Sequence, residues 1–285
     1  MNYSQSQTKS KIFILFSIFL CLSLSSFGQS KAQTLGWKLG VQAWTFRNFS
    51  FSETLDKINQ LGLHYVEGYP GQKIGAGIEG GLDFNMSPEK RKLVLDLLHK
   101  KRIRLVSYGV VNIKSREEWE QVFQFGKAMG LENIVAEPKP EDLGYISLLC
   151  DKYKINIAIH NHPQPSHYWH PDTLLTALKL ATSTRIGSCS DVGHWRRSGL
   201  NAVESLKKLQ GHIIEVHLKD VIDAKDPSEE TIWGKGGNDM KAVFTELNHQ
   251  HFKGVMSIEY ESNPADNMSE IKQSIAFLNT IIEKF

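Results

Sequence analysis

Residues 155–162 read Ile-Asn-Ile-Ala-Ile-His-Asn-His, and this alternation predicts a β-strand that ends in histidines. Successive side chains along a strand point to opposite faces. The three isoleucines therefore share one face, whereas Asn156, Ala158 and His160 share the other. A strand with one branched apolar face and one polar face is predicted to lie between a hydrophobic layer and a polar interior.

Similar strand patterns alternate with longer amphipathic patterns from about residue 37 to the C-terminus. The eight strand candidates are Lys38–Trp44, His64–Gly68, Ile103–Tyr108, Asn133–Glu137, Ile155–His160, Ile186–Asp191, Ile213–Lys219 and Val255–Tyr260. A helix candidate follows each strand, and the first begins at a capping box of Ser50 and Glu53. Eight such pairs in about 250 residues predict an α/β fold, a single (β/α)8 TIM barrel over residues 37–285.

An open, doubly wound sheet is the alternative architecture. It would carry a glycine-rich phosphate-binding turn after the first strand. Residues 40–44, Gly-Val-Gln-Ala-Trp, provide no such turn. The closed barrel is therefore favoured.

The first 28 residues differ from the rest of the chain. Lys9 and Lys11 precede an uncharged run from Ile12 to Phe27, and small residues before Gln29 offer a cleavage site. This pattern predicts a signal peptide over residues 1–28 and a secreted or periplasmic protein with no stable membrane span after cleavage. Removing the two lysines balances the 31 acidic residues with equally many basic ones.

Composition narrows the partners and the metal chemistry. The chain has 41% hydrophobic and 22% charged residues, as in globular proteins, and its basic residues form no cluster with aromatics. A nucleic-acid partner is therefore not expected. Three cysteines without a Cys-x-x-Cys spacing exclude a thiolate zinc site, so any metal must be held by histidines and carboxylates. The sequence leaves open whether the protein forms a homo-oligomer.

Polar residues end five consecutive strand candidates on the face predicted to point inward. They are Glu137, His160, Asp191, His217 and Glu259. Active sites of such barrels lie at the C-terminal ends of the strands. Three carboxylates buried together repel one another unless a cation neutralises them. We therefore expect these five residues to form a site for a divalent metal, and their imidazoles and carboxylates suit Mn²⁺, Co²⁺, Zn²⁺ or Mg²⁺.

Five motifs carry a resemblance to a known family. They are Asn133-Ile-Val-Ala-Glu-Pro138, Ile157-Ala-Ile-His-Asn-His-Pro163, Ser190-Asp-Val-Gly-His-Trp195, Glu215-Val-His-Leu-Lys-Asp220 and Ser257-Ile-Glu-Tyr-Glu261. From about residue 37 to residue 285 the chain resembles the secreted branch of the xylose isomerase-like TIM-barrel family, the sugar phosphate isomerase/epimerase superfamily. Such proteins hold a divalent metal with a Glu, an Asp, a His and a second Glu.

Carried over by residue, the resemblance implies Asp191, His217 and Glu259 as metal ligands. His160 stands where the sugar epimerases have their first Glu, so either His160 or Glu137 would complete the set. The resemblance further implies a small-molecule carbohydrate as the substrate.

The resemblance implies a sugar isomerase or epimerase that abstracts a proton next to a carbonyl through a metal-stabilised enediolate. The candidate catalytic residues are Glu137, His160, Glu259, His162 and Lys219. Because His160 replaces a carboxylate, the alternative is a lyase or hydratase that eliminates the aglycone from 3-keto-glycosides. A non-catalytic sugar-binding barrel is less favoured, and balanced charge disfavours a DNA-repair phosphodiesterase.

The remaining polar and aromatic residues have weaker assignments. His194 resembles a family histidine that contacts substrate hydroxyls, whereas Lys219 would either neutralise an oxyanion or pair with Glu215 or Glu137. Three tryptophans would either stack on a sugar or pack in the core: Trp44, Trp169 and Trp195. Residues 233–237, Trp-Gly-Lys-Gly-Gly, are expected to form a flexible loop over the site.

Overall fold

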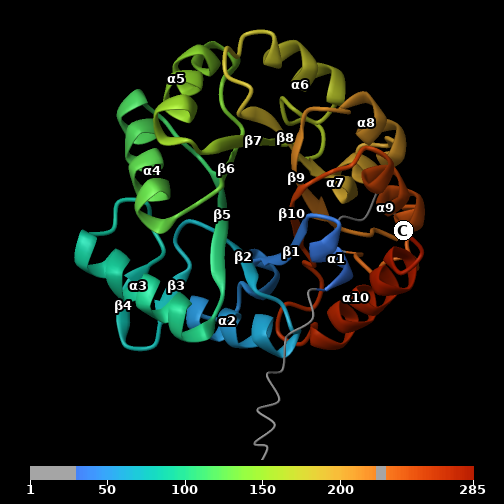
Figure 1. The fold of residues 1–285 in the computed structure, drawn as a ribbon, viewed down its shortest axis with the longest axis horizontal. Helices are drawn as coiled ribbons and strands as arrows, with labels where there is room; N and C mark the ends of the chain where they lie inside the picture. The colour runs from blue at the N-terminus through green and yellow to red at the C-terminus, as the bar shows by residue number, and fades with distance from the viewer. Residues whose placement is uncertain (1–29, 223–228) are drawn as a thin grey trace, which may run out of the picture.

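The computed structural model describes residues 30–222 and 229–285. Eight parallel strands close into a barrel in the order β1-β10-β9-β8-β7-β6-β5-β2, and β2 pairs with β1 (Figure 1). These strands are β1 (Trp37–Gln42), β2 (Tyr65–Gly68), β5 (Arg104–Val111), β6 (Asn133–Ala136), β7 (Asn156–His160), β8 (Ile186–Asp191), β9 (Ile213–Leu218) and β10 (Gly254–Ile258). The predicted single (β/α)8 TIM barrel is confirmed.

Helices form a ring around the barrel (Figure 1). They are α1 (Lys31–Thr34), α2 (Phe51–Gln60), α3 (Pro88–Lys101), α4 (Arg116–Met129), α5 (Leu143–Tyr153), α6 (Pro171–Leu178), α7 (Val192–Arg197), α8 (Ala202–Lys208), α9 (Met240–His249) and α10 (Met268–Ile282). Two 3₁₀ turns, η1 (Ala43–Phe46) and η2 (Pro140–Asp142), follow β1 and β6. A hairpin of β3 (Lys73–Gly75) and β4 (Ile78–Gly81) lies between β2 and α3 in sequence.

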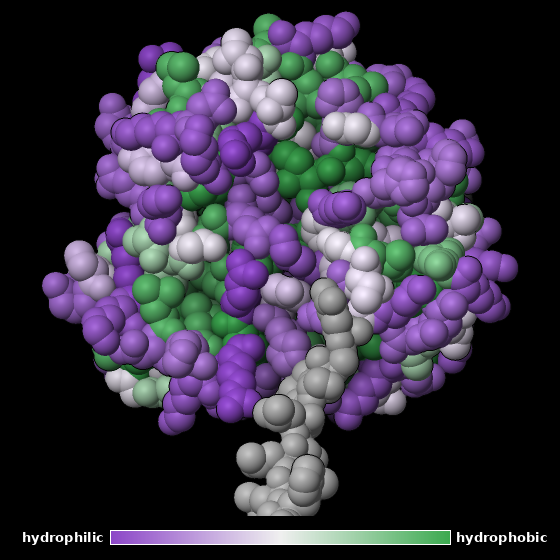
Figure 2. Space-filling model, in the orientation of Figure 1, coloured by the Kyte–Doolittle hydropathy of each residue, from purple (hydrophilic) through white to green (hydrophobic). Residues whose placement is uncertain are grey.

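The predicted signal peptide over residues 1–28 lies outside the described residues. Within residues 30–222 and 229–285, no helix is both long enough and apolar enough to cross a membrane. Hydrophilic side chains cover most of the rim of the molecule (Figure 2).

Alternation along the strands divides the interior into two layers. On β7, Ile157 and Ile159 pack in the large core between sheet and helices, whereas Ala158 packs with Val135 and Cys189 in a separate cluster inside the barrel. The predicted alternation on this strand is therefore confirmed.

One residue of β9 departs from the predicted alternation. Strict alternation on β9, with His217 directed inward, would place Ile214 on the face toward the helices, but Ile214 packs against the cluster inside the barrel. The register shifts between β8 and β9, so that Ser188 pairs with Ile213 and Cys189 with Glu215. This bulge gives β9 one extra residue and turns Ile214 inward, while Glu215 and His217 keep their predicted direction.

Four strands end earlier than predicted: β6 and β9 by one residue, and β1 and β10 by two. β1 ends at Gln42, and Trp44 lies in η1 because the Gln42 side chain caps that turn by accepting a hydrogen bond from the Trp44 amide at 2.6 Å. β10 ends at Ile258, so Glu259 is the first residue after the strand. Ending a strand just before a polar residue leaves that residue at the mouth of the barrel.

Candidate active site

Four predicted ligands converge where β7, β8, β9 and β10 end. His160, Asp191, His217 and Glu259 each offer a ligand atom, and these atoms all lie within 4.8 Å of one another. All four residues are buried. Because the four strands are consecutive in the barrel, their C-terminal ends bring together residues far apart in sequence.

The donor set fits a divalent cation. Asp191 Oδ2, Glu259 Oε2, His217 Nδ1 and both His160 ring nitrogens are buried and lack a hydrogen-bond partner among the described residues. Lys219 Nζ lies 3.2 Å from Asp191 Oδ2, and His217 Nδ1 lies 2.9 Å from Glu259 Oε2, whereas neither His160 nitrogen has a carboxylate nearer than 3.6 Å. Buried polar atoms normally have hydrogen-bond partners, so this convergence of donor atoms suits a bound cation. Two carboxylates with two imidazoles match the preferences of Zn²⁺, Mn²⁺ and Co²⁺.

The electrostatic environment of the cluster keeps its two carboxylates ionised. Burial opposes ionisation of Glu259, but Lys219 and His217 outweigh it and lower the pKa of Glu259 to about 2. Burial likewise opposes ionisation of Asp191, yet Lys219 and His160 lower its pKa well below the usual value. Both carboxylates are therefore ionised and ready to bind a cation at neutral pH.

A carboxylate behind His217 fixes the orientation of its ring. His217 Nε2 lies 2.8 Å from Glu67 Oε2, which leaves Nδ1 directed at the ligand cluster. The same Glu67 oxygen accepts a hydrogen bond of 2.7 Å from Ser257, whose hydroxyl also lies 3.1 Å from Glu215. The sequence pattern assigned no role to Glu67, which lies next to the last residue of β2. A ligand histidine backed by a carboxylate is a common arrangement in metal sites.

Glu137 lies one residue beyond β6 and belongs to a neighbouring group. It contacts His162 Nδ1, accepts a 2.7 Å hydrogen bond from Ser166, and lies 3.6 Å from His160 Nδ1. Burial would raise the pKa of Glu137, but the bonds from His160, His162 and Ser166 lower it overall. Of the two candidates for the first ligand position, His160 lies within the four-residue cluster, whereas Glu137 lies behind it.

Lys219 pairs with different carboxylates from those expected. Its ammonium lies 3.2 Å from Asp191 and 3.1 Å from both Glu259 and Glu261, rather than beside Glu215 or Glu137. The Lys219 side chain is fully buried and does not line the cavity described below. Its position suits charge compensation among the carboxylates better than direct contact with a substrate.

His194 joins the cluster to the cavity wall. Its backbone amide donates to Asp191 Oδ1 at 2.8 Å, and its Nδ1 lies 3.1 Å from Arg197. Burial lowers the pKa of His194 well below its usual value, so the ring is neutral at neutral pH. Arg197 also binds Glu230 at 2.7 Å and Glu261 at 3.3 Å. A neutral histidine held in this way can donate or accept a hydrogen bond from a substrate hydroxyl.

A cavity of about 1020 Å³ opens above the cluster. Its polar lining includes Glu137, His162, His194, Arg197 and Glu259. The predicted catalytic and binding residues on this wall therefore share one solvent-filled space, and the ligand Glu259 reaches it directly. This size is at the upper end of the range typical of small-molecule sites.

The three tryptophans considered for sugar stacking differ in their access to the cavity. Trp44 lines the cavity and is 41% exposed. Trp195 lies in the hydrophobic core with 1% of its surface exposed, so its ring has no face free for a sugar, in contrast to the predicted stacking role. Trp169 is half-buried outside the cavity lining and packs edge-on against His170. Sequence alone did not distinguish them because all three follow strand ends.

The loop at residues 233–237 binds a carboxylate of its own chain. The Asp220 side chain accepts hydrogen bonds from the amides of Gly234 at 2.9 Å and Gly236 at 3.0 Å, and from Asn238 at 3.1 Å. Trp233 is buried against Phe244. The expected loop over the site is thus anchored away from the cavity lining by Asp220.

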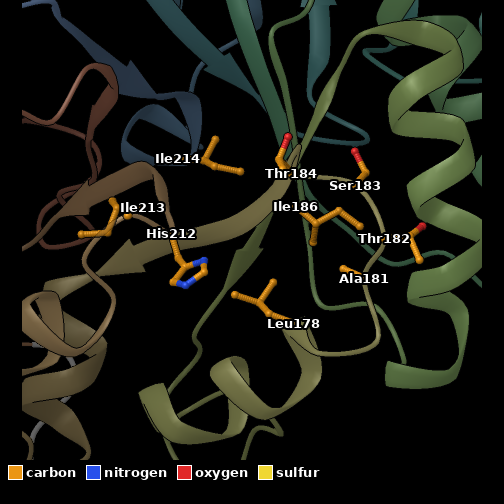
Figure 3. A pocket seen from close by; sticks show the side chains of 10 residues that line it. Leu178, Ala181, Thr182, Ser183, Thr184, Ile186, His212, Ile213 and Ile214 are labelled. Carbon is orange, nitrogen blue, oxygen red and sulfur yellow. The ribbon is translucent and has the colours of Figure 1, made fainter.

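A second cavity of about 450 Å³ lies at the other end of the barrel. Leu178 of α6 and Ile186 at the start of β8 face the same hollow as His212 (Figure 3). Because it adjoins the N-terminal ends of β8 and β9, this hollow is separated from the ligand cluster by the length of the strands.

The fold and the site together define a class: a closed (β/α)8 barrel with a histidine and carboxylate cluster at the C-terminal ends of its strands. Residues 55–281 match the family described as Xylose isomerase-like TIM barrel. The chain belongs to this family, as its motifs predicted.

Three known proteins show the range of similarity. Inosose dehydratase of Clostridium perfringens is 25% identical over 142 residues, which cover 44% of this chain and 47% of that protein. The matched region thus spans about half the length of this relative. The crystal structure of an uncharacterized protein from Parabacteroides distasonis is 36% identical, covers 86% of this chain and 99% of its own, and superposes with a TM-score of 0.71.

The structure of an IolI protein with a bound zinc atom has the same fold. It is 16% identical, covers 87% of this chain and 99% of its own, and has a TM-score of 0.68. At this identity the likeness concerns the fold.

Proposed function

We propose that the protein is a divalent-metal-dependent carbon–oxygen lyase for ketone-bearing carbohydrates. It removes the proton from the carbon beside the ketone and expels the substituent from the next carbon, as from C1 of a 3-keto-glycoside. The proposal rests mainly on the contact between Glu137 and His162 on the wall of the cavity, beside the four-residue cluster. A relative named as a dehydratase is consistent with elimination.

His160, Asp191, His217 and Glu259 would hold the cation. When bound, a divalent cation supplies Lewis-acid stabilisation of the negative charge that develops on the substrate oxygen. The convergence of these buried ligand atoms supports the assignment, as does the zinc atom of the IolI neighbour.

His162 is the residue that we assign to proton transfer. Its Nδ1 is bonded to Glu137, which fixes the ring, and its side chain is 48% exposed on the cavity wall. Histidine exchanges protons near neutral pH, and a carboxylate partner stabilises the imidazolium that forms. The strongly acidic Glu259 is a poor base by comparison, since its pKa is lowered to about 2.

An isomerase or epimerase is the second candidate. It begins with the same proton removal, but the proton returns to the substrate and no group departs. His162 lines the cavity, and in this reading it returns to the substrate the proton that it removes. The proposal also places the enzyme outside the cytoplasm, because of the signal-peptide pattern over residues 1–28.

Proton NMR in D₂O distinguishes these reactions. The metal-loaded protein is mixed with a 3-keto-glucoside, and the C2 proton and the aglycone are followed together. Loss of the C2 proton with aglycone release supports the lyase, whereas exchange or inversion at C2 without release supports the epimerase. If neither signal changes, 3-keto-glycosides are not substrates.

Two sets of variants test the assigned roles. His162→Gln is expected to lower kcat by about 10²-fold or more while retaining metal, with His167→Gln outside the cavity lining as the control. Asp191→Asn and Glu259→Gln are expected to lose metal, measured by elemental analysis. Full metal content in both would show that the ligand assignment is wrong.

A further inference from the structure

The active-site cavity has two chemically different walls. The polar wall comes from residues that follow β6, β7, β8 and β10 and includes the ligand Glu259. The opposite wall comes from the loops after β1, β2 and β5, from the segment before α3, and from α4. We call this second wall the aromatic arc, and its large side chains are Trp44, Tyr69, Phe84 and Trp119.

The aromatic arc presents mostly carbon to a ligand, and its aromatic side chains add only the Tyr69 hydroxyl and the indole N–H groups of Trp44 and Trp119 as hydrogen-bonding groups. Pro70, Val110, Val111 and Ile113 complete it beside the four aromatic residues, with Asn112 as a polar side chain among them. Gln42 also lines the cavity, but its amide donates to Gly109 and accepts from Trp44, so both of its polar atoms are already used. A hydroxyl-rich ring on this wall would leave hydroxyls unpaired, which is costly.

Trp44 is held in place despite its exposure. Its ring meets Tyr69 edge-on at 5.1 Å, and the Arg47 guanidinium lies 5.6 Å from the ring centroid. It is the sole aromatic residue among the exposed large hydrophobic residues of the described chain. An ordered, exposed indole beside a ligand cluster provides a ready surface for a planar apolar group.

From this division of the cavity we infer that the natural substrate carries an aromatic or similarly apolar leaving group, which the aromatic arc binds while the polar wall binds the keto-sugar. The inference rests on the proposed lyase function. In the reaction the C2–H bond breaks and a C1–C2 double bond forms. The C1–O bond breaks with its electron pair, and the departing oxygen takes a proton. The products are an unsaturated keto-sugar and an apolar alcohol or phenol, and no oxidant is needed.

Benzyl and methyl 3-keto-glucosides test the inference because their leaving alcohols are similar in acidity. The metal-loaded wild-type enzyme is expected to favour the benzyl compound in kcat/KM by about tenfold or more. Trp44→Ala is expected to remove most of this preference, because it lowers kcat/KM for the benzyl compound much more than for the methyl compound. Trp169→Ala, a tryptophan outside the cavity lining, should leave the preference intact.

The inference fails if the wild-type enzyme treats both compounds alike, or if 3-keto-cellobiose is the better substrate, since a sugar would then occupy the arc. Binding of unoxidised benzyl and methyl glucosides, measured by calorimetry, separates this failure from that of the proposed function. If no ketone reacts but benzyl glucoside binds more tightly and Trp44→Ala removes the difference, the subsite stands and the lyase does not. Equal binding of the two glucosides would overturn the subsite itself.

Discussion

Each histidine of the ligand cluster has a carboxylate behind it. Glu67 contacts the far nitrogen of His217, and Glu137 lies 3.6 Å from the far nitrogen of His160. A carboxylate bonded to the far nitrogen, as Glu67 is, fixes the ring orientation and makes the facing nitrogen a better ligand. Glu137, one residue beyond β6, is near His160 but too distant for a hydrogen bond.

Replacing Glu67 with Gln should weaken metal binding without removing a ligand. The amide keeps the size of the side chain but loses the charge that polarises His217, so the affinity for Zn²⁺ should fall by about 10- to 100-fold. Calorimetric titration of the metal-free protein measures this change. Glu215→Gln is the matched control inside the same barrel, because burial next to Glu67 raises the pKa of Glu215 to about 8 and so favours the neutral acid, which an amide resembles. Equal affinities in the two variants would argue against a role for Glu67.

At the scale of elements, helix capping was predicted from sequence and can be measured. Ser50 accepts a hydrogen bond from the Glu53 amide at 3.3 Å, and Glu53 accepts one from the Ser50 amide at 2.8 Å. At the start of α3, the Ser87 hydroxyl accepts a hydrogen bond from the Lys90 amide at 3.3 Å, but the Lys90 side chain does not bond back to the Ser87 amide.

Ser50→Ala should therefore cost about 1 kcal/mol of unfolding free energy, and Ser87→Ala should cost less. Replacing Ser50 also removes its hydroxyl bond to the Glu53 carboxylate, at 2.6 Å. Urea denaturation curves fitted with one common m-value give the change in unfolding free energy for both variants. The capping-box interpretation would be contradicted if Ser87→Ala proved the more costly substitution.

Local patterns predicted the elements, but they missed what depends on contacts between elements. The strand alternation identified His160, Asp191, His217 and Glu259 because the barrel geometry follows from the period of two. The alternation did not predict the inward direction of Ile214, because a bulge arises from pairing between two strands. The sequence pattern did not predict the aromatic arc for a similar reason. Trp119 fits the apolar stripe of α4, and nothing in its own helix indicates that it also borders the cavity.

The closed barrel makes the whole molecule depend on one continuous sheet. Cys150 of α5 packs in the core outside the sheet, whereas Cys189 packs inside the barrel, and both are fully buried. Burial raises the pKa of the Cys150 thiol to about 12 and that of Cys189 well above its usual value. Because the thiolate is the reactive form, neither cysteine should react with iodoacetamide at pH 8 while the protein is folded.

Both cysteines should become reactive together if the barrel and its helices unfold as one unit. The helical layer buries its apolar face only against the sheet, and the sheet has no free edge once β1 pairs with β2, so neither layer is stable alone. Pulse labelling across a urea series, with peptide mass spectrometry to separate Cys150 from Cys189, should give coincident midpoints. Labelling of Cys150 at a lower urea concentration would mean instead that α5 detaches while the barrel interior stays closed, and that the two layers have separate stabilities.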